Sequence, residues 1–136
     1  MSQDTSYEFT TEIPVEFAEA EKLVREALAA KGFGVLTEID VRSTMKTKLD
    51  VDFRPYRILG ACNPQLALGA LGAEPGIGVL LPCNVVIEYV GQVQTRIRFM
   101  EPVAVLEMVS NPEVVAIAQE ASSRLHQVAQ QLADNH

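Results

Sequence analysis

The order of hydrophobic and polar residues predicts two strands and a helix in the first part of the chain. Residues 7–13 alternate between apolar and polar side chains, as the residues of a half-buried strand do. From 17 to 28 the apolar residues recur at steps of three and four, which predicts an amphipathic helix. Residues 33–40 alternate again, so a second strand is expected, with Val35 and Ile39 on one face.

The middle of the chain is divided by prolines and glycines into shorter elements. Apolar residues at four-residue steps over 41–49 favour a short helix, and 57–61 is predicted to be a short strand. Asn63-Pro64 and Asn111-Pro112 each place asparagine at an N-cap and proline at the first helical position, so a helix should begin at both. Glycines and prolines between 72 and 78 predict a loop.

The last part of the chain predicts a hairpin followed by a long helix. Residues 79–90 are expected to form a long apolar strand, and Pro82 near its start indicates an edge position or a bulge there. Gly91-Gln92 turns this strand into a second one with alternating side chains. After one or two helical turns over 103–109, an apolar stripe over 114–132 predicts a helix that lies flat on the sheet.

The element order is therefore β-α-β-β-β-β-α with short extra helices. Two long helices can cover one face of a mainly antiparallel sheet, which makes the predicted fold an α+β two-layer sandwich. A chain of 136 residues suits a single domain, residues 1–136. The uncovered face should be polar around Arg98, while the apolar Leu36 and Val86 suggest that a partner subunit covers part of it.

Composition narrows the classes of function. A hydrophobic content of 48% and a charged content of 21% are typical of a globular protein. The net charge of −7 argues against a nucleic-acid partner, because phosphate contacts need an extended basic face. No apolar run is long enough to span a membrane, and Met1 to Thr5 lack the features of a secretory signal. We therefore expect a cytoplasmic protein with free thiols.

Two related motifs contain both cysteines. Ala61-Cys62-Asn63-Pro64 is followed 21 residues later by Pro82-Cys83-Asn84-Val85. Cys62 directly precedes a predicted helix start, where unsatisfied backbone N–H groups stabilise a thiolate, so it is a candidate nucleophile. The alternative is a small buried apolar residue, which is what most free cysteines are. Cys83 lies in a predicted strand, where the same alternative is stronger.

No resident metal or cofactor is predicted. The cysteine pair could act as a redox couple or bind a soft metal, but two sulfurs are too few for a closed zinc site. The only histidines are His126 and His136, and neither forms a ligand cluster with the cysteines in the sequence. A metal site would need ligands from a second subunit.

Positive charge is concentrated just before the first Cys-Asn motif, in a protein that is acidic overall. Five of the eleven basic residues lie within sixteen positions: Arg42, Lys46, Lys48, Arg54 and Arg57. The planar arginine side chain suits carboxylates, phosphates and other oxyanions. The sequence thus predicts a pocket for a small anion, formed by Arg54, Tyr56, Arg57 and the Cys62-Asn63 turn. The alternative is that Arg54 and Arg57 pair with Asp50 and Asp52.

The segments 32–40, 53–64 and 80–85, which include both Cys-Asn motifs, resemble the DUF302 family of small prokaryotic proteins without a known function. The resemblance implies a curved antiparallel sheet with helices on one face, similar to one half of a TATA-binding protein, and a homodimer. It assigns no catalytic residue. The family's motif positions fall here on Arg54, Pro55, Tyr56, Arg57, Cys62, Asn63, Pro64, Pro82, Cys83 and Asn84.

These observations support three hypotheses about function. The first is a cytoplasmic, homodimeric protein that binds a small anionic or sulfur-containing ligand. The second is a sulfur-transfer or redox enzyme in which Cys62 is the nucleophile and Arg57 holds an oxyanion. The third is a structural or partner-binding domain. The predicted ligand-binding residues are Arg54, Tyr56, Arg57, Cys62, Asn63, Cys83 and Asn84.

Overall fold

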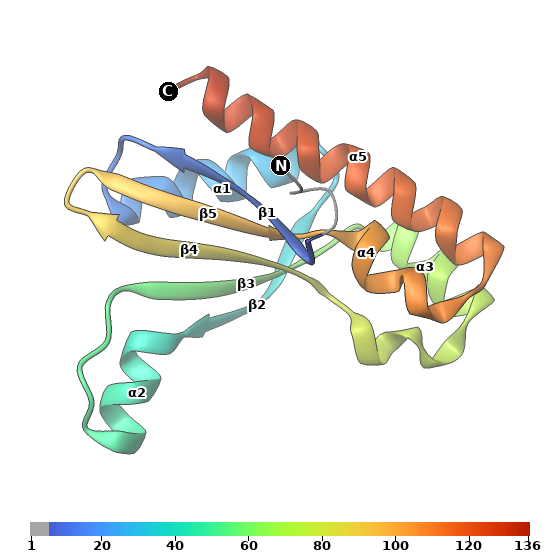
Figure 1. The fold of residues 1–136 in the computed structure, drawn as a ribbon, viewed down its shortest axis with the longest axis horizontal. Helices are drawn as coiled ribbons and strands as arrows, with labels where there is room; N and C mark the ends of the chain where they lie inside the picture. The colour runs from blue at the N-terminus through green and yellow to red at the C-terminus, as the bar shows by residue number, and fades with distance from the viewer. Residues whose placement is uncertain (1–5) are drawn as a thin grey trace.

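The computed structural model describes residues 6–136, which form an antiparallel five-stranded sheet with helices packed on one face (Figure 1). The α+β two-layer architecture predicted from the sequence is confirmed. The elements in chain order are β1 (Glu8–Ile13), α1 (Phe17–Ala30), β2 (Gly34–Asp40), α2 (Val41–Leu49), β3 (Tyr56–Cys62), α3 (Pro64–Ala73), η2 (Pro75–Leu80), β4 (Cys83–Gly91), β5 (Gln94–Met100), α4 (Pro102–Leu106), η3 (Glu107–Val109) and α5 (Pro112–Asp134).

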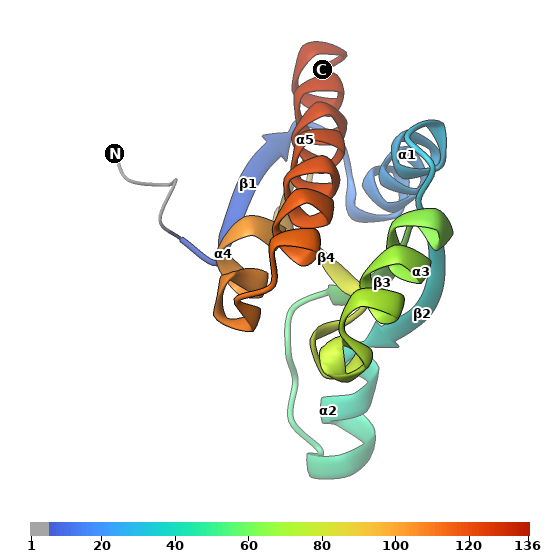
Figure 2. The same cartoon turned by 90° about the vertical axis from the view of Figure 1, so that its right-hand side faces the viewer.

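The strand order is β1-β5-β4-β3-β2, so β4 lies at the centre of the sheet. Direct pairing of Leu59 with Val85, and of Val85 with Phe99, puts three buried side chains in a row on one face. Helices α1 and α5 cover this face and form the main core with it (Figure 2). The opposite face, which we call the open face, has no such helical cover. Figure 2 shows α2 projecting away from the other helices.

Local sequence signals fix the starts of α3 and α5 as predicted. The Asn63 side chain accepts a hydrogen bond from the backbone N–H of Leu66, and Asn111 accepts one from that of Glu113. Each asparagine thereby satisfies a backbone donor that the first turn of a helix leaves free. The predicted hairpin between β4 and β5 is also present, with Gln92 and Val93 as its turn after the Gly91–Gln94 pair.

The strand predicted over 79–90 is wrong at its start. Val79 and Leu80 belong to η2, and β4 begins only at Cys83. Pro82 therefore lies before the strand, where its missing N–H removes no ladder hydrogen bond. Strand β4 can therefore occupy the centre of the sheet, whereas Pro82 in the sequence indicated an edge position or a bulge.

A bulge in β2 changes the face on which its last residues lie. Val35 pairs with Ala61 but Thr37 already pairs with Gly60, so one residue is extra. Simple alternation puts Ile39 on the helix-covered face with Val35. The bulge instead turns Ile39 to the open face, where half of its surface is exposed.

No helix within residues 6–136 is both long and apolar enough to cross a membrane. The expectation that the chain lacks a secretory signal concerned residues 1–5, which lie outside the described residues. A cytoplasmic location stays a prediction.

Candidate functional site

The seven predicted ligand-binding residues occupy three separate places instead of one pocket. Those that line an apolar cavity at the end of β3 are Cys62, Asn63 and Cys83. Those that line a polar hollow on the open face are Arg54, Tyr56 and Asn84. Arg57 lines neither, because successive side chains of a strand point to opposite faces and Arg57 follows Tyr56.

The first site, which we call the cysteine cavity, has a volume of about 290 Å³. It lies between the ends of β3 and β4 and the helices α3, α4 and α5. Its walls are almost entirely apolar and include Phe33, Leu66, Leu71, Leu106, Ile117 and Ala118. The polar groups in this lining are two thiols and the buried Asn63 amide. Such a cavity suits a small molecule with an apolar body.

The two Cys-Asn motifs meet at this cavity because their strands are antiparallel neighbours. Strand β3 ends at Cys62, and Asn63 then turns the chain into α3. Strand β4 begins at Cys83, which pairs directly with Ala61. The end of one strand therefore lies beside the start of the next. The repeated motif was the sequence signal for this contact, although it did not say which face each side chain would take.

The two thiols differ in accessibility, and burial changes the acidity of Cys83. Both cysteines are free; Cys62 is half-buried and Cys83 is buried. Burial raises the pKa of the Cys83 thiol from 9.0 to about 11, and the nearby Cys62 adds to the shift. Cys83 is therefore protonated at neutral pH, and Cys62 is the more accessible nucleophile.

We expect iodoacetamide to alkylate Cys62 at pH 7.5 in the folded protein while Cys83 stays unmodified. Alkylation needs a sulfur that the reagent can reach and that is ionised. Cys83 is buried, and its thiol stays protonated until the pH approaches about 11. Mass spectrometry of peptides after timed labelling measures the two rates separately, and protein in denaturant, where both cysteines should label, is the control. Modification of Cys83 before Cys62 would contradict this assignment.

The second site, the open-face hollow, has a volume of about 470 Å³. Its floor is the carboxylate of Glu88, which is almost fully buried. Arg54 reaches Glu88 Oε2 with Nε at 3.0 Å and Nη2 at 2.6 Å. Arg98 donates from Nε to Glu88 Oε1 at 2.9 Å and from Nη1 to the carboxylate of Glu8. The Arg54 guanidinium also lies over the ring of Phe53, 4.9 Å from its centre.

The acidity of Glu88 reflects two opposing effects. Burial disfavours the ionised carboxylate, but hydrogen bonds and charge from Arg54 and Arg98 outweigh it and hold the pKa below its usual 4.5. Glu88 is thus ionised at neutral pH. Glu88 is not among the seven residues predicted from the sequence. A glutamate within an otherwise apolar strand is nevertheless a sign of a buried charge that needs partners.

Arg57 lies on the helix-covered face at the other end of β3 from Cys62. Its Nη2 is 3.0 Å from Asp40 Oδ2, and its Nη1 is 3.0 Å from Glu21 Oε1 on α1. Cys62 is five residue steps along the strand from Arg57, a distance of about 16 Å. Arg57 therefore cannot hold an oxyanion at Cys62 of the same chain.

The alternative pairing of the two arginines is also wrong. Asp50 Oδ1 is 2.9 Å from Lys46 Nζ, and Asp52 Oδ1 is 3.7 Å from the same atom. Arg54 pairs instead with Glu88, 34 residues further along the chain. Arg54 and Arg57 are thus neutralised by carboxylates that are distant in sequence, whereas Lys46 pairs with two nearby aspartates.

The α4 wall of the cysteine cavity is held by Glu101. Its carboxylate accepts a hydrogen bond from the backbone N–H of Val103 and lies 2.7 Å from His126 Nε2 on α5. Burial raises the pKa of Glu101, but hydrogen bonds from His126, Ser122 and Val103 outweigh it and lower the pKa below 4.5. The ionised form is therefore the one that the fold stabilises.

We expect Glu101→Gln to lower the free energy of unfolding by about 1–2 kcal/mol at pH 7, the usual contribution of hydrogen bonds to a charged group. The contribution is fully present above the unfolded pKa and is lost as the pH falls through the lower pKa of the folded protein. Urea unfolding of both proteins from pH 7 to pH 3 measures it. A difference that stays constant over this range would show that ionisation of Glu101 is not its source.

Comparisons with known proteins agree with this fold. Residues 9–132 match the family described as "Domain of unknown function DUF302". The chain is also similar to an uncharacterized conserved DUF302 protein from Bacillus stearothermophilus whose crystal structure is known. The two sequences are 28% identical and the two structures superpose with a TM-score of 0.84. The match covers 93% of this chain and 98% of that protein. No curated protein sequence matches the chain.

Proposed function

Because the chain belongs to the DUF302 family, for which no function is known, we propose a function from its own geometry: it binds a small sulfur-containing molecule with an apolar body in the cysteine cavity. The observation that carries the proposal is an apolar space of about 290 Å³ beside two thiols. The cavity is partly open to solvent, so a ligand can reach it in the folded protein. The anion expected from the sequence fits this cavity poorly, since none of the arginines lines it.

The size of the cavity limits the ligand. A dry cavity of about 150 Å³ accommodates benzene, so about 290 Å³ suits a two-ring molecule or a chain of similar volume. Sulfur is a soft, polarizable atom that packs well against apolar and aromatic groups. A thiol or thioether can therefore lie beside Cys62 and Cys83 without leaving a polar group unpaired. This is the physical reason for preferring sulfur to a charged group here.

We expect the neutral fluorescent two-ring probe 1-aminonaphthalene to bind in the cysteine cavity, and Ala67→Phe to weaken its binding at least about tenfold. The new ring occupies the space that the probe needs. Ala67 lines the cavity and is half-buried, so the folded state should survive the substitution. The matched control is Leu68→Phe, which adds a ring at the neighbouring, exposed position of α3. Fluorescence titration measures both affinities.

The sulfur preference is tested by competition with a matched pair of neutral ligands, 2-(methylthio)naphthalene and 2-methoxynaphthalene, under reducing conditions. The thioether should displace the probe at a lower concentration than the ether, and Cys62→Ala should reduce this difference in competing concentration. Equal competition by the two ligands would contradict the preference for sulfur. Equal affinity of Ala67→Phe and Leu68→Phe for the probe would show that the cysteine cavity is not the binding site.

A second candidate is a thiol-dependent enzyme, and the half-buried position of Cys62 beside Asn63, the N-cap of α3, favours it. The free N–H groups at a helix start stabilise thiolate. Its test is the pH dependence of Cys62 alkylation in the folded protein. A rate that is already at its plateau near pH 7 would support a nucleophilic role, whereas a rate that rises up to about pH 8.5 would describe an ordinary thiol.

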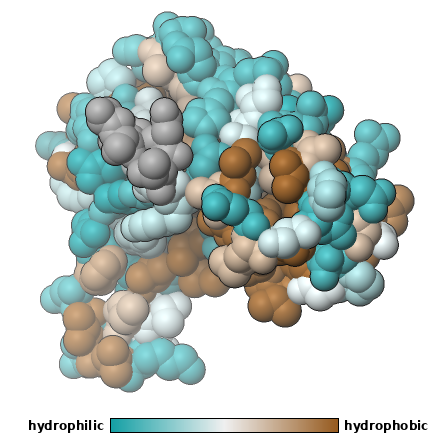
Figure 3. Space-filling model, turned by 45° about the vertical axis from the view of Figure 1, so that its right-hand side comes forward, coloured by the Kyte–Doolittle hydropathy of each residue, from teal (hydrophilic) through white to brown (hydrophobic). Residues whose placement is uncertain are grey.

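We also propose that the protein is a cytoplasmic homodimer in which a second copy covers part of the open face. Figure 3 shows apolar side chains on the underside of the molecule, between the arm that contains α2 and the end formed by α3 and η2. Leu36 is 68% exposed and Val79 is 88% exposed, which is costly for the isolated chain. If the protein shows neither thiol chemistry nor ligand binding, this apolar surface supports the third hypothesis, a structural or partner-binding domain.

Light scattering on a sizing column is expected to give twice the chain mass of 14.9 kDa for the native protein. Ile39→Glu should shift it to the monomer, because Ile39 is exposed on the open face and an interface cannot bury an unpaired charge cheaply. Val115→Glu is the control, since it adds the same charge at an exposed position of α5, on the other side of the sheet. A native monomer at micromolar concentration would remove the dimer proposal.

A further inference from the structure

We infer that the open-face hollow is a second binding site, separate from the cysteine cavity, and that it takes a small aromatic carboxylate. The inference is independent of the proposed function, because the two sites share no lining residue. Asn84 and Cys83 are neighbours on β4 but point to opposite faces of the sheet. A ligand in one site therefore does not contact the other.

The hollow contains hydrogen-bond donors that the protein itself leaves unused. Each arginine has five N–H donors. Arg54 uses Nε and Nη2, and Arg98 uses Nε and Nη1. Within residues 6–136, Arg54 Nη1, Arg98 Nη2 and the Asn84 amide have no hydrogen-bond partner. Arg54 comes from the segment before β3, Asn84 from β4 and Arg98 from β5, and all three residues line the hollow.

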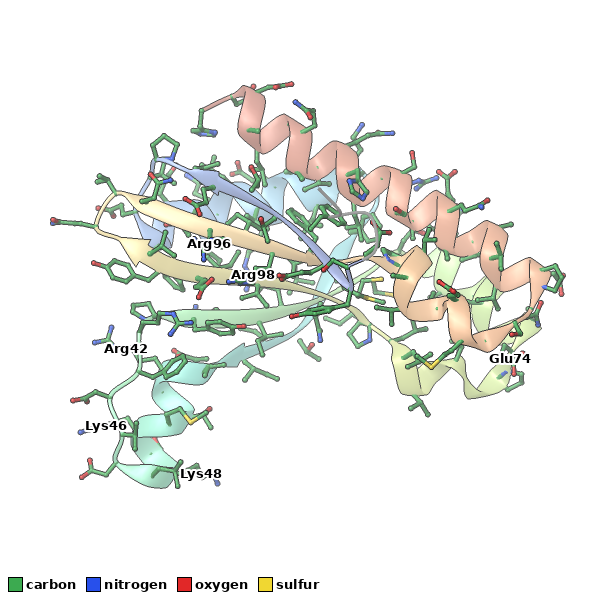
Figure 4. The ribbon with its side chains drawn as sticks, viewed as in Figure 1. Arg42, Lys46, Lys48, Glu74, Arg96 and Arg98 are labelled. Atoms are coloured by element: carbon green, nitrogen blue, oxygen red, sulfur yellow. The ribbon has the colours of Figure 1, made fainter. Side chains whose placement is uncertain are left out.

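Glu88 fixes these donors in place. Because the buried carboxylate accepts from both arginines, their side chains are held before any ligand arrives. Preorganisation of this kind lowers the entropy lost on binding. Figure 4 shows Arg96 and Arg98 beside each other on β5, while Arg42 and Lys48 lie on the projecting α2 arm. The positive charge of that arm is therefore not part of the hollow.

The charge balance of the hollow favours a singly charged anion over a dianion. Arg54 and Arg98 contribute two positive charges, and Glu88 and Glu8 contribute two negative ones. Arg96 Nη1 is also 3.7 Å from Glu88 Oε1, but Arg96 is itself paired with Glu12. A dianion such as phosphate would add a second uncompensated charge next to these carboxylates. A planar carboxylate matches the planar guanidinium donors and adds only one.

The remaining walls of the hollow select an apolar, planar body. They include Tyr56, Val86, Met100 and Val105, all of them half-buried. An aromatic ring of the ligand can stack on Tyr56 or pack against the aliphatic side chains while its carboxylate faces the arginines. Lining with both charged donors and apolar groups is the usual composition of a small-molecule site.

The test is an NMR titration of ¹⁵N-labelled protein with phenylacetate, with phenylacetamide and phenyl phosphate as the neutral and dianionic comparisons. We expect saturable shifts at the amides of β4 and β5 around Asn84 and Arg98, and none around Cys62. Phenylacetate should bind at least about tenfold more tightly than either comparison ligand, a difference of about 1.4 kcal/mol. Tighter binding of phenyl phosphate would overturn the carboxylate class.

Two variants and two controls complete the test. Asn84→Ala removes a donor that takes no part in the ion pairs, so it should weaken phenylacetate binding about three- to tenfold without unfolding the protein. Arg54→Gln should weaken it at least about tenfold. Gln92→Ala, an exposed amide in the β4–β5 turn, and Ala67→Phe, in the cysteine cavity, should leave it unchanged. Unchanged affinity in Asn84→Ala, or loss of affinity in Ala67→Phe, would overturn the inference.

Discussion

Replacement of Glu88 by glutamine is expected to lower the free energy of unfolding by about 2–3 kcal/mol. The substitution keeps the shape of the side chain but removes the charge that Arg54 and Arg98 both contact. Loss of one partner of a buried ion pair typically costs about 3–5 kcal/mol, because the other charge stays desolvated. The expected value is smaller here because both arginines are partly exposed and can regain water.

Urea unfolding at pH 7 measures this effect, and Glu12→Gln is the matched control. Glu12 pairs with Arg96 on the same face, but its carboxylate is 39% exposed, so its loss should cost less than about 1 kcal/mol. The pKa of Glu88 is lowered in the folded protein, so its contribution is complete above 4.5 and is lost as the pH falls through the folded value. Equal effects of the two substitutions would mean that burial of Glu88 adds nothing.

Gly60→Ala is expected to destabilise the protein by about 2 kcal/mol through overpacking. Gly60 lies in the middle of β3, and a Cβ at this position would stand 2.8 Å from Pro82 Cγ and in closer conflict with Thr37 Oγ1. Thr37 can rotate, but the proline ring has little room to move. Either the two strands separate locally or the loop before β4 shifts.

The matched control for this prediction is Gly34→Ala in the neighbouring strand, where a Cβ meets no atom within 4 Å. It should be neutral, or stabilising by up to about 0.5 kcal/mol, because alanine restricts the unfolded chain. Thermal unfolding compares the two variants. Adding Thr37→Ala to Gly60→Ala should restore part of the stability. A Gly60→Ala protein as stable as Gly34→Ala would show that the close approach is not a constraint.

Gly60 and Glu88 matter beyond stability because β3 and β4 carry both candidate sites. The end of β3 supplies Cys62 to the cysteine cavity, and the segment before the strand supplies Arg54 to the open-face hollow. The two sites therefore share this pair of strands but have no lining residue in common. Ligand binding at each site can be studied separately with Asn84 and Cys62 variants.

Local sequence determined much of the fold. The two Asn-Pro helix starts, the amphipathic helix α1 and the β4–β5 hairpin each depend on residues close together in the chain, and each was predicted. The start of β4 and the face of the sheet on which Ile39 lies were not predicted correctly. The first depends on the turn before Cys83 and the second on the bulge after Val35, and neither feature is visible in the periodic pattern of the sequence.

The grouping of the site residues was decided by tertiary structure. The sequence identified the Cys-Asn motifs and the basic segment as unusual, and the motifs do meet at a cavity. The sequence could not show that Arg54 pairs with Glu88, 34 residues away, or that Arg57 points to the helix-covered face of the sheet. Strand pairing and register set which distant charges become neighbours, and alternation along a strand separates residues adjacent in sequence. The sequence by itself therefore determined which residues could carry chemistry, and the fold decided which of them can act together.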